Sequence, residues 1–267
     1  MKREIKLIED LSLNAWPSHQ IQFYDGWILR FSYFYTHRTN SVEQLGPSTL
    51  PLEEKIHYCE KIYQNWGTPA IFKITPLLPE GFEKLLITAS YRTEHITEVM
   101  HLDFKQNAPQ SFSPLVTLEK GVSDKWINGL FALKGTTNAM HRLVVPSMYR
   151  AIPKETISAA IYDEHKIVAT GLGILDRDYI GLYAIHVHPA YRQKGYARSL
   201  CSSILEAGKI LGASHSYLQV VKGNTPAKNL YKSLGFQDLY TYWFRVKELP
   251  YSPKDSAQRF NISRIGS

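Results

Sequence analysis

Cysteine is scarce in this sequence, and long hydrophobic runs are missing. Two of the 267 residues are cysteines, Cys59 and Cys201, each within a helix-like apolar pattern. We expect two buried free thiols, not a disulfide or a nucleophile. No run of about 18 apolar residues occurs, which predicts no transmembrane helix. The segment Met1–Lys6 lacks the apolar core of a signal peptide, so we expect a cytoplasmic protein.

Blocks of one charge are also missing. The formal charge is +7, but the Lys and Arg residues are scattered. Such an excess fits nucleic acid, an acidic membrane surface or a small anion. Attraction of a polyphosphate cofactor is enough to account for the excess, and the charge alone does not decide. No basic aromatic platform or RNA motif is visible, so we expect neither nucleic acid nor membrane as partner. No Cys/His cluster has the spacing of a zinc site, and the pair His186-x-His188 alone is weak evidence for a metal. We therefore expect no metal.

The second half of the chain predicts an α/β fold. The polar stretch at 105–114 is interpreted as a linker. Alternating apolar residues predict strands, and apolar residues spaced i, i+3, i+4 predict helices with one buried face. The expected elements are a strand at 115–118, a helix at 124–133 capped by Ser123, a loop, strands at 156–162, 166–175 and 179–187, a helix at 197–211, a strand at 216–221, a helix capped by Thr225 and a strand at 240–246. This order predicts a sheet flanked by helices.

The first half repeats part of this pattern at an offset of 145 residues. Tyr217–Val220 then lies over Phe72–Thr75, and the long helix lies over Leu52–Trp66. Identity is low, so the signal is one of pattern. It predicts two similar lobes.

A segment with the features of an anion site joins the strand ending at Val187 to the long helix. It contains Arg192, Gln193, Lys194, Gly195, Tyr196, Ala197 and Arg198. Glycine lets a ligand approach the backbone, and the first N–H groups of a helix have no partner within it. With the helix dipole, these groups favour an anion.

A second segment, Asn224 to Phe236, follows the next strand. The amide of Asn224 could bond a peptide-like ligand arm, or it could cap the chain turn. Tyr231 lies on the inner stripe of a short helix, where it is either functional or a core residue. The residues alone favour the structural alternative for both.

Together the two segments resemble the GNAT superfamily of acyl-CoA-dependent acyltransferases. The cofactor motif Q/R-x-x-G-x-G/A appears as Arg192-x-x-Gly195-x-Ala197, after Val187-x-Pro189. The second motif matches at Asn224, Ala227, Leu230, Tyr231, Gly235 and Phe236. The resemblance covers about residues 115–247.

The resemblance implies two GNAT-like lobes, each a mixed, mostly antiparallel sheet flanked by helices, with strands 4 and 5 splayed in the C-terminal lobe. It implies an acetyl-CoA site in which the backbone of Ile185, His186 and Val187 bonds the pantetheine arm. The loop from Gln193 to Arg198, with Arg192 before it, holds the diphosphate, and Asn224 contacts the pantetheine. By the same resemblance, Tyr231 binds the cofactor and protonates the leaving CoA thiolate.

The general base departs from the family pattern. Many relatives carry Glu or His at places that correspond here to Gly181 and Tyr183, and neither residue is a base. Three alternatives for the general base remain: His186, Asp178 and a relay through water. Strict alternation along the strand turns His186 away from Tyr183 and Val187.

The first lobe resembles a degenerate copy, with Pro47, Leu50 and Leu86 at the places of Arg192, Gly195 and Tyr231. We expect no CoA site there. Arg30, Arg38 and Asn40 either line a substrate cleft or are ordinary surface or lobe-interface residues. In the last strand, Tyr240, Tyr242, Trp243 and Phe244 either shape an acceptor pocket or fill the core.

We therefore expect a degenerate lobe at 1–104, a linker at 105–114, a catalytic N-acetyltransferase domain at 115–250 and a tail at 251–267. The expected reaction is direct transfer of acetyl from acetyl-CoA to a primary amine in a ternary complex. The alternative is a non-catalytic acyl-CoA-binding sensor. The acceptor and the oligomeric state stay open.

Overall fold

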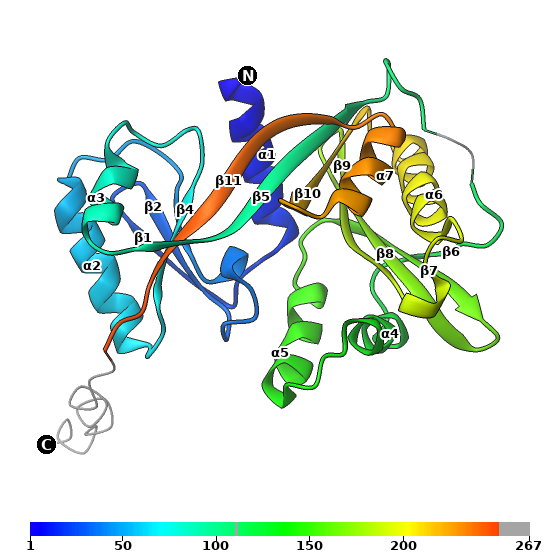
Figure 1. Ribbon diagram of the computed structural model, residues 1–267, viewed down its shortest axis with the longest axis horizontal. Coiled ribbons are helices and arrows are strands. Elements are labelled where there is room, and N and C mark those ends of the chain that lie inside the picture. The colour runs from blue at the N-terminus through cyan, green and yellow to red at the C-terminus, as the bar shows by residue number, and fades with distance from the viewer. Residues whose placement is uncertain (110–111, 251–267) are drawn as a thin grey trace, which may run out of the picture. The chain divides into compact units, whose positions relative to one another are not determined.

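The computed structural model describes residues 1–109 and 112–250, and contacts divide the chain into two units (Figure 1). Among the described residues, the C-terminal unit contains Met1–Pro17 and Ile96–Tyr242, and the N-terminal unit contains Ser18–His95 and 243–250. The expected tail at 251–267 lies outside the described residues. The functional boundaries at 104 and 115 stay a prediction.

The N-terminal unit has a small sheet with two helices. The strands are β1 (Gln20–Tyr24), β2 (Trp27–Phe31), β3 (Val42–Gln44) and β4 (Ala70–Ile74), in that order, and the helices are α2 (Leu52–Asn65) and α3 (Phe82–Thr88), with a short 3-10 turn, η1, at His37–Thr39. Its core is rich in aromatic residues from the strands and both helices, among them Trp27, Tyr63, Phe72 and Phe82. These residues bury large apolar areas, which stabilises so small a unit.

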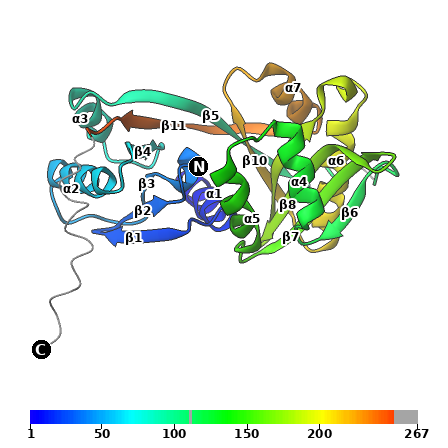
Figure 2. The same cartoon turned by 90° about the horizontal axis from the view of Figure 1, so that it is seen from below.

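The C-terminal unit has a longer sheet in the order β5-β10-β9-β8-β7-β6. Its strands are β5 (Arg92–Asp103), β6 (Thr117–Lys120), β7 (Glu155–Asp163), β8 (Lys166–Asp176), β9 (Tyr179–Val187) and β10 (His215–Val221), and its helices are α1 (Lys2–Ala15), α4 (Asp124–Lys134), α5 (Ala139–Arg150), α6 (Tyr196–Ile210) and α7 (Thr225–Ser233), with a 3-10 turn, η2, at Pro189–Tyr191. In Figure 2, α4 and α5 lie on the side of β7 and β8 that faces the viewer.

Two strands contain residues of both units. In β5, Thr97–Asp103 pair antiparallel with β10, and in β11 (Gln237–Lys247), Trp243–Lys247 pair antiparallel with β4. Each half of the chain therefore gives its last strand to the sheet that the other half builds. The offset of 145 residues separates Ala70 from His215 and Arg92 from Gln237, so the strand starts follow the predicted repeat.

Helix α6 packs closely on one face of the C-terminal sheet. Two glycines of β8 permit this, since a Cβ at Gly171 or Gly173 would come within 2.9 Å of the Ile204 side chain. Leu200, Cys201, Ile204 and Leu205 are buried in the same core. Cys201 and Cys59 are both buried free thiols, and burial raises the pKa of each, that of Cys201 to about 12. The prediction of two buried free thiols is confirmed.

Two local expectations were wrong. The expected loop after α4 contains α5, which Asn138 caps by accepting a hydrogen bond from the N–H of His141. Pro146 lies within this helix, and proline argues against a helix interior because it lacks an N–H. Helix α7 is capped by Asn224, one residue before the expected Thr225.

Ser123 caps α4 as predicted, with its hydroxyl accepting from the N–H of Trp126. In the described ranges, no helix combines the length and the hydropathy needed to span a bilayer.

Candidate functional site

Strands β9 and β10 separate part of the way along their length. They pair in parallel from Tyr179 with His215 to Leu182 with Leu218, and the pairing ends there. Beyond this point β9 continues to Val187 and stays paired with β8 on its other side. The β10-facing edge of 183–187 therefore has backbone groups available to a ligand, which confirms the expected splay.

A β-bulge in β9 lies at the start of this separated segment. Thr170 pairs with His186, whereas Leu172 pairs with Tyr183, so β9 contains one extra residue. Ala184 has a φ of +49°, which is uncommon for a residue with a Cβ. The bulge reverses the alternation of side chains from this point on.

The bulge changes the expected direction of His186. Ile185 faces α6, because a Cβ at Gly171 would come within 2.9 Å of both Ile185 and Ile204. His186 therefore faces the opposite side, the same side as Tyr183. The expectation that His186 faces away from Tyr183 was wrong, because strict alternation ignores the extra residue. The expectation that it faces away from Val187 is confirmed.

The backbone of Val187 points into the gap. The N–H of His188 donates to the carbonyl of Val168 at 2.9 Å, which makes His188 a hydrogen-bonded position of the β8–β9 ladder. In an antiparallel ladder such positions alternate, so the N–H and C=O of Val187 point away from β8. The C=O of Val187 accepts from Nε of Arg192 at 3.4 Å, and its N–H faces the space that β10 leaves.

The loop before α6 presents a row of free amides. Gln193 has a φ of +61° and Gly195 a φ of +80°, and these left-handed residues turn the chain into the helix. Within the described part of the chain, we find no acceptor for the backbone N–H groups of 193–198. A Cβ built on Gly195 meets nothing within 4 Å, so open space lies beside the loop. Successive free amides at a helix start form an anion site.

Basic side chains surround this loop. Arg192 and Lys194 are exposed, and Lys194 Nζ lies 5.0 Å from the centre of the Tyr191 ring. Tyr191 stacks on Tyr196 with ring centres 6.3 Å apart and donates its hydroxyl to Asp163. Arg198 donates to the hydroxyl of Ser233 on α7. The rim is therefore positive, as an anionic ligand requires.

Asn224 acts as a helix cap. Its Oδ1 accepts from the N–H of Ala227 at 3.3 Å, which is the structural alternative considered for this residue. A cap uses the side-chain oxygen and leaves the Nδ2 donors for another partner.

Tyr231 joins α7 to the core. It is 8% exposed and contacts Phe236 edge-on, with ring centres 6.1 Å apart. Burial, and then the nearby Cys201, raise the pKa of its phenol above the usual value. Among the described residues no hydrogen-bond partner is found for its hydroxyl. A neutral phenol with a free O–H is a proton donor, so core packing and a donor role are compatible.

The face of β9 opposite α6 carries tyrosines at the place where many relatives have the carboxylate or histidine of the general base. A Cβ on Gly181 would come within 2.7 Å of the Tyr183 ring and 2.8 Å of the Tyr217 ring. The two hydroxyls hydrogen-bond at 2.6 Å, and Tyr217 is 2% exposed. The tyrosine pair fills the space that a side chain at 181 would need.

The remaining titratable candidates differ in position. Asp178 precedes β9 and accepts from Ser214 at 2.9 Å, and a rise of about 3.3 Å per residue places it roughly 30 Å from Val187. His186 lies next to Val187. Burial, and then the charges of Lys134 and Arg192, lower the pKa of His186 to about 4, so its imidazole is neutral at pH 7.

The equivalent loop of the N-terminal unit has its amides occupied. The carboxylate of Asp25, in the turn between β1 and β2, accepts from the N–H groups of Thr49 and Leu50 at 3.0 Å each. Pro47 and Pro51 have no N–H to offer. The N–H of Leu50 is the main cause that holds the pKa of Asp25 well below its usual range. An internal carboxylate thus bonds the backbone amides of this loop.

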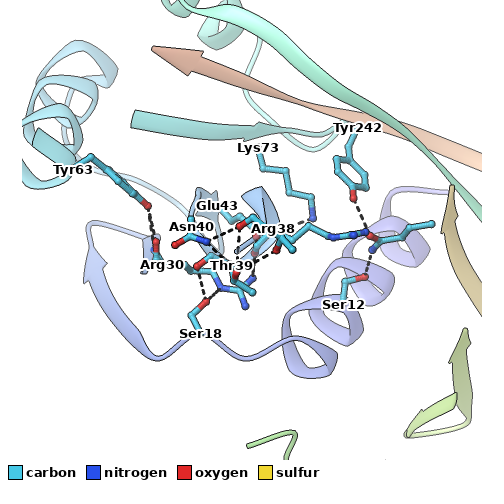
Figure 3. A network of polar contacts seen from close by, with 12 residues as sticks. Ser12, Ser18, Arg30, Arg38, Thr39, Asn40, Glu43, Tyr63, Lys73 and Tyr242 are labelled. Carbon is cyan, nitrogen blue, oxygen red and sulfur yellow. Dashed lines mark hydrogen bonds and ion pairs between the residues drawn. The ribbon is translucent and has the colours of Figure 1, made fainter. Parts of the chain in front are cut away.

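Arg30 and Asn40 belong to a polar network of the N-terminal unit (Figure 3). Arg30 is 3% exposed, donates to Ser18 at 2.9 Å and pairs with Glu43 at 3.3 Å, and Lys73 pairs with the other oxygen of Glu43. The Oδ1 of Asn40 accepts from the N–H of Ser32 at 2.6 Å. Both residues are buried and have structural contacts within their own unit, so neither is the ordinary surface residue of the structural alternative.

The aromatic residues of β11 also have structural contacts. Within the C-terminal unit, Tyr242 donates to Gln219 at 2.8 Å and Tyr240 donates to Glu9. Within the N-terminal unit, Trp243 donates to Glu83 at 2.7 Å. These bonds favour the core interpretation of the strand.

Sequence reasoning missed two features of the site. The bulge at Ala184 leaves no signal in the sequence, because alanine is not a residue that marks a positive φ. The closure of the first loop by Asp25 was signalled only by the pair Asp25-Gly26, which is typical of a hairpin turn.

A splayed parallel strand pair beside a helix start with free amides is the arrangement of GNAT-type acetyltransferases. The family model described as "Probable histone acetyltransferase Rv0428c C-terminal" matches residues 3–244, so the chain belongs to this family. It is a member of the GNAT superfamily of N-acetyltransferases, which confirms the resemblance and the enzyme class.

Individual relatives agree with this assignment. The chain is 27% identical to the uncharacterised N-acetyltransferase YobR of Bacillus subtilis over 251 residues, covering 91% of this chain and 99% of the relative. A GCN5-related N-acetyltransferase from Kribbella flavida has a similar structure, with a TM-score of 0.68 at 13% identity, covering 94% of this chain and 97% of the other. A tandem GNAT protein from the clavulanic acid biosynthesis pathway has a TM-score of 0.63 at 11% identity, covering 92% and 89%. The two structures show the fold, including a two-lobe arrangement.

Proposed function

We propose that this chain transfers an acetyl group from acetyl-CoA to a primary amine, and that the C-terminal unit alone binds the cofactor. The observation that carries the proposal is the row of free amides at 193–198 beside open space at Gly195. The diphosphate of CoA would accept from these amides, with Arg192 and Lys194 at its rim. The loop of the N-terminal unit lacks this capacity, since Asp25 already binds its amides.

The pantetheine arm would lie in the gap between β9 and β10. It is peptide-like, so it can bond the free edge of 183–187 as an additional strand would. This position brings the thioester carbonyl to the N–H of Val187, which would stabilise the oxyanion that forms on attack. The amide nitrogen of Asn224, which its capping bond leaves free, would bond the arm from the other side.

The reaction needs a neutral amine and a proton for sulfur. The amine attacks the thioester carbon, the C–S bond breaks, and the CoA thiolate takes the phenolic proton of Tyr231. A base works best when its pKa is near the working pH, and His186 at about 4 is far below it. We propose that the acceptor binds as a free amine, that the nitrogen loses its surplus proton to solvent after attack, and that the Tyr231 phenolate regains a proton from solvent.

Thiol release from acetyl-CoA, measured over amino acids, polyamines, aminoglycosides and peptides, tests the proposal. Amine-dependent release by the wild type, lost in Gly195→Glu, would support it. The matched control is Gly212→Glu, because Gly212 also has a positive φ and open space but lies after the far end of α6. Tight CoA binding without thiol release over the whole panel would contradict the enzyme and indicate a sensor.

A further inference from the structure

Two histidines and a glutamate meet in the N-terminal unit, outside the site described above. His37 lies in the 3-10 turn before β3, and Glu94 and His95 lie near the start of β5. Nε2 of His37 is 2.9 Å from Oε2 of Glu94, and Nε2 of His95 is 3.9 Å from the same oxygen. One ligand atom from each residue lies within 4.8 Å of the other two.

These separations match those around a small divalent cation. Zinc binds imidazole nitrogen and carboxylate oxygen at about 2.0–2.2 Å, and tetrahedral geometry then places its ligand atoms roughly 3.3 Å apart. The distances of 2.9 and 3.9 Å lie on either side of this value.

The surroundings hold the three side chains in place. Nε of Arg92 donates to Oε1 of Glu94 at 2.7 Å, which leaves Oε2 facing the histidines. The ring of Phe244 contacts His37 edge-on at 5.3 Å. His95 has a φ of +49°, and strain of this kind in a residue with a Cβ is common at functional sites. A bound carboxylate with its second oxygen hydrogen-bonded is typical of metal ligands.

The exposure of the cluster leaves a position open for a water ligand. Glu94 is its one carboxylate, and the Oε1 of Glu94 is bonded to Arg92. His95 has 57% of its side chain exposed, whereas His37 has 21%, so the cluster opens to solvent on the His95 side. A water molecule can occupy a fourth position there.

We propose that His37, Glu94 and His95 form a three-ligand site for Zn²⁺ with water as the fourth ligand. The site is separate from the CoA loop and does not depend on acetyl transfer. The alternative is an imidazole–carboxylate hydrogen bond that binds no metal. Because residues 37 and 94 are far apart in sequence, no motif spacing reveals the cluster.

Zinc titration of the full-length protein tests the site. The protein is stripped with a chelator, and Zn²⁺ binding is measured by competition with a chromophoric chelator. We expect one Zn²⁺ per chain, with an affinity that falls about tenfold or more in Glu94→Gln and in His95→Ala. His165→Ala, an exposed histidine in the turn between β7 and β8, and His188→Ala are matched controls and should bind as the wild type does.

Two results would overturn the proposal. The first is no stoichiometric Zn²⁺ on the wild type, and the second is equal affinity in Glu94→Gln, His95→Ala and the wild type. A shift of the melting temperature by Zn²⁺ provides a second readout, since a ligand that binds the folded state stabilises it. The shift should appear in the wild type and His165→Ala, and it should vanish in Glu94→Gln. His95→Ala removes an exposed side chain, so it keeps the test decisive if a more buried change disturbs folding.

Discussion

Two loops of this chain lead from a strand into a long helix, one into α2 and one into α6, at an offset of 145 residues. The loop before α6 presents six backbone amides without an acceptor among the described residues, next to open space. The loop before α2 has two prolines, and its amides at Thr49 and Leu50 bond the carboxylate of Asp25. The loop before α6 therefore has backbone amides available to a ligand, whereas the amides of Thr49 and Leu50 are used within the N-terminal unit.

The hairpin turn next to each loop makes this difference. In the N-terminal unit, a Cβ on Gly26 would come within 2.2 Å of the carbonyl oxygen of Pro47, so the turn lies directly on the loop. The side chain of Lys55 is fully buried. Its Nζ lies 3.1 Å from Oδ2 of Asp25 and 4.0 Å from the centre of the Trp27 ring. In the C-terminal unit, the carboxylate of Asp163 in the corresponding hairpin accepts from the hydroxyl of Tyr191, and the loop amides stay free. The carboxylate of Asp25 therefore bonds the backbone amides of its loop, whereas the carboxylate of Asp163 bonds a side-chain hydroxyl.

The largest effect is expected at Gly195. Gly195→Glu would place a carboxylate beside the diphosphate and a side chain at a φ of +80°. Two negative charges placed side by side cost several kcal/mol of binding free energy, so the affinity for CoA should fall on the order of 100-fold or more. Calorimetry with CoA measures this fall, and Gly212→Glu should bind nearly as the wild type does. Unchanged affinity in Gly195→Glu would show that the loop does not hold the cofactor.

A smaller effect is expected at Tyr231, whose counterpart in the first lobe is Leu86. Tyr231→Phe keeps the packing against Phe236 but removes the proton for sulfur. Proton transfer by a positioned side chain contributes typically about 100-fold or more, so kcat should fall roughly 10- to 100-fold with CoA affinity nearly unchanged. Tyr179→Phe, a buried tyrosine at the far end of β9, is the control. Equal turnover in Tyr231→Phe would limit Tyr231 to a packing role.

The hydrogen bonds between Asp25 and the loop before α2 lead to a prediction about stability. Asp25→Asn removes the negative charge that Thr49, Leu50 and the buried Lys55 share, so the melting temperature should fall by several degrees without creating a second CoA site. The folded pKa of Asp25 is lowered, so its contribution is present above the unfolded pKa and is lost as pH falls below about 4. Thermal unfolding across this acidic range should show a weaker pH dependence in the variant.

Asp124→Asn is the control for the closed loop. It removes an exposed carboxylate paired with Arg150, and exposed pairs contribute little. A melting temperature of Asp25→Asn as high as that of this control would show that Asp25 does not stabilise its loop.

The smallest effect is expected at His186. Activity should rise with pH as the acceptor loses its proton, and His186 should add no limb between about pH 6 and 9 because its pKa is about 4. The pH profile of kcat/KM in His186→Gln should therefore match that of the wild type. A limb present in the wild type and missing in the variant would make His186 the general base.

The order of elements and the residues of the α6 loop could be predicted from the sequence. Periodicity located the strands and the long helix, and the glycine at 195 marked the turn that only a residue without a Cβ adopts easily. The bulge at Ala184 and the helix containing Pro146 could not be predicted, because tertiary packing imposes them against the local preference. The group of His37, Glu94 and His95 was also invisible, since folding alone brings distant residues together.

A structure of the protein determined with CoA bound tests the central claim most directly. The account predicts that diphosphate oxygens accept from the amides of 193–198, while Asp25 still holds the amides of Thr49 and Leu50. A diphosphate bound elsewhere, or a second CoA at the loop before α2, would contradict it.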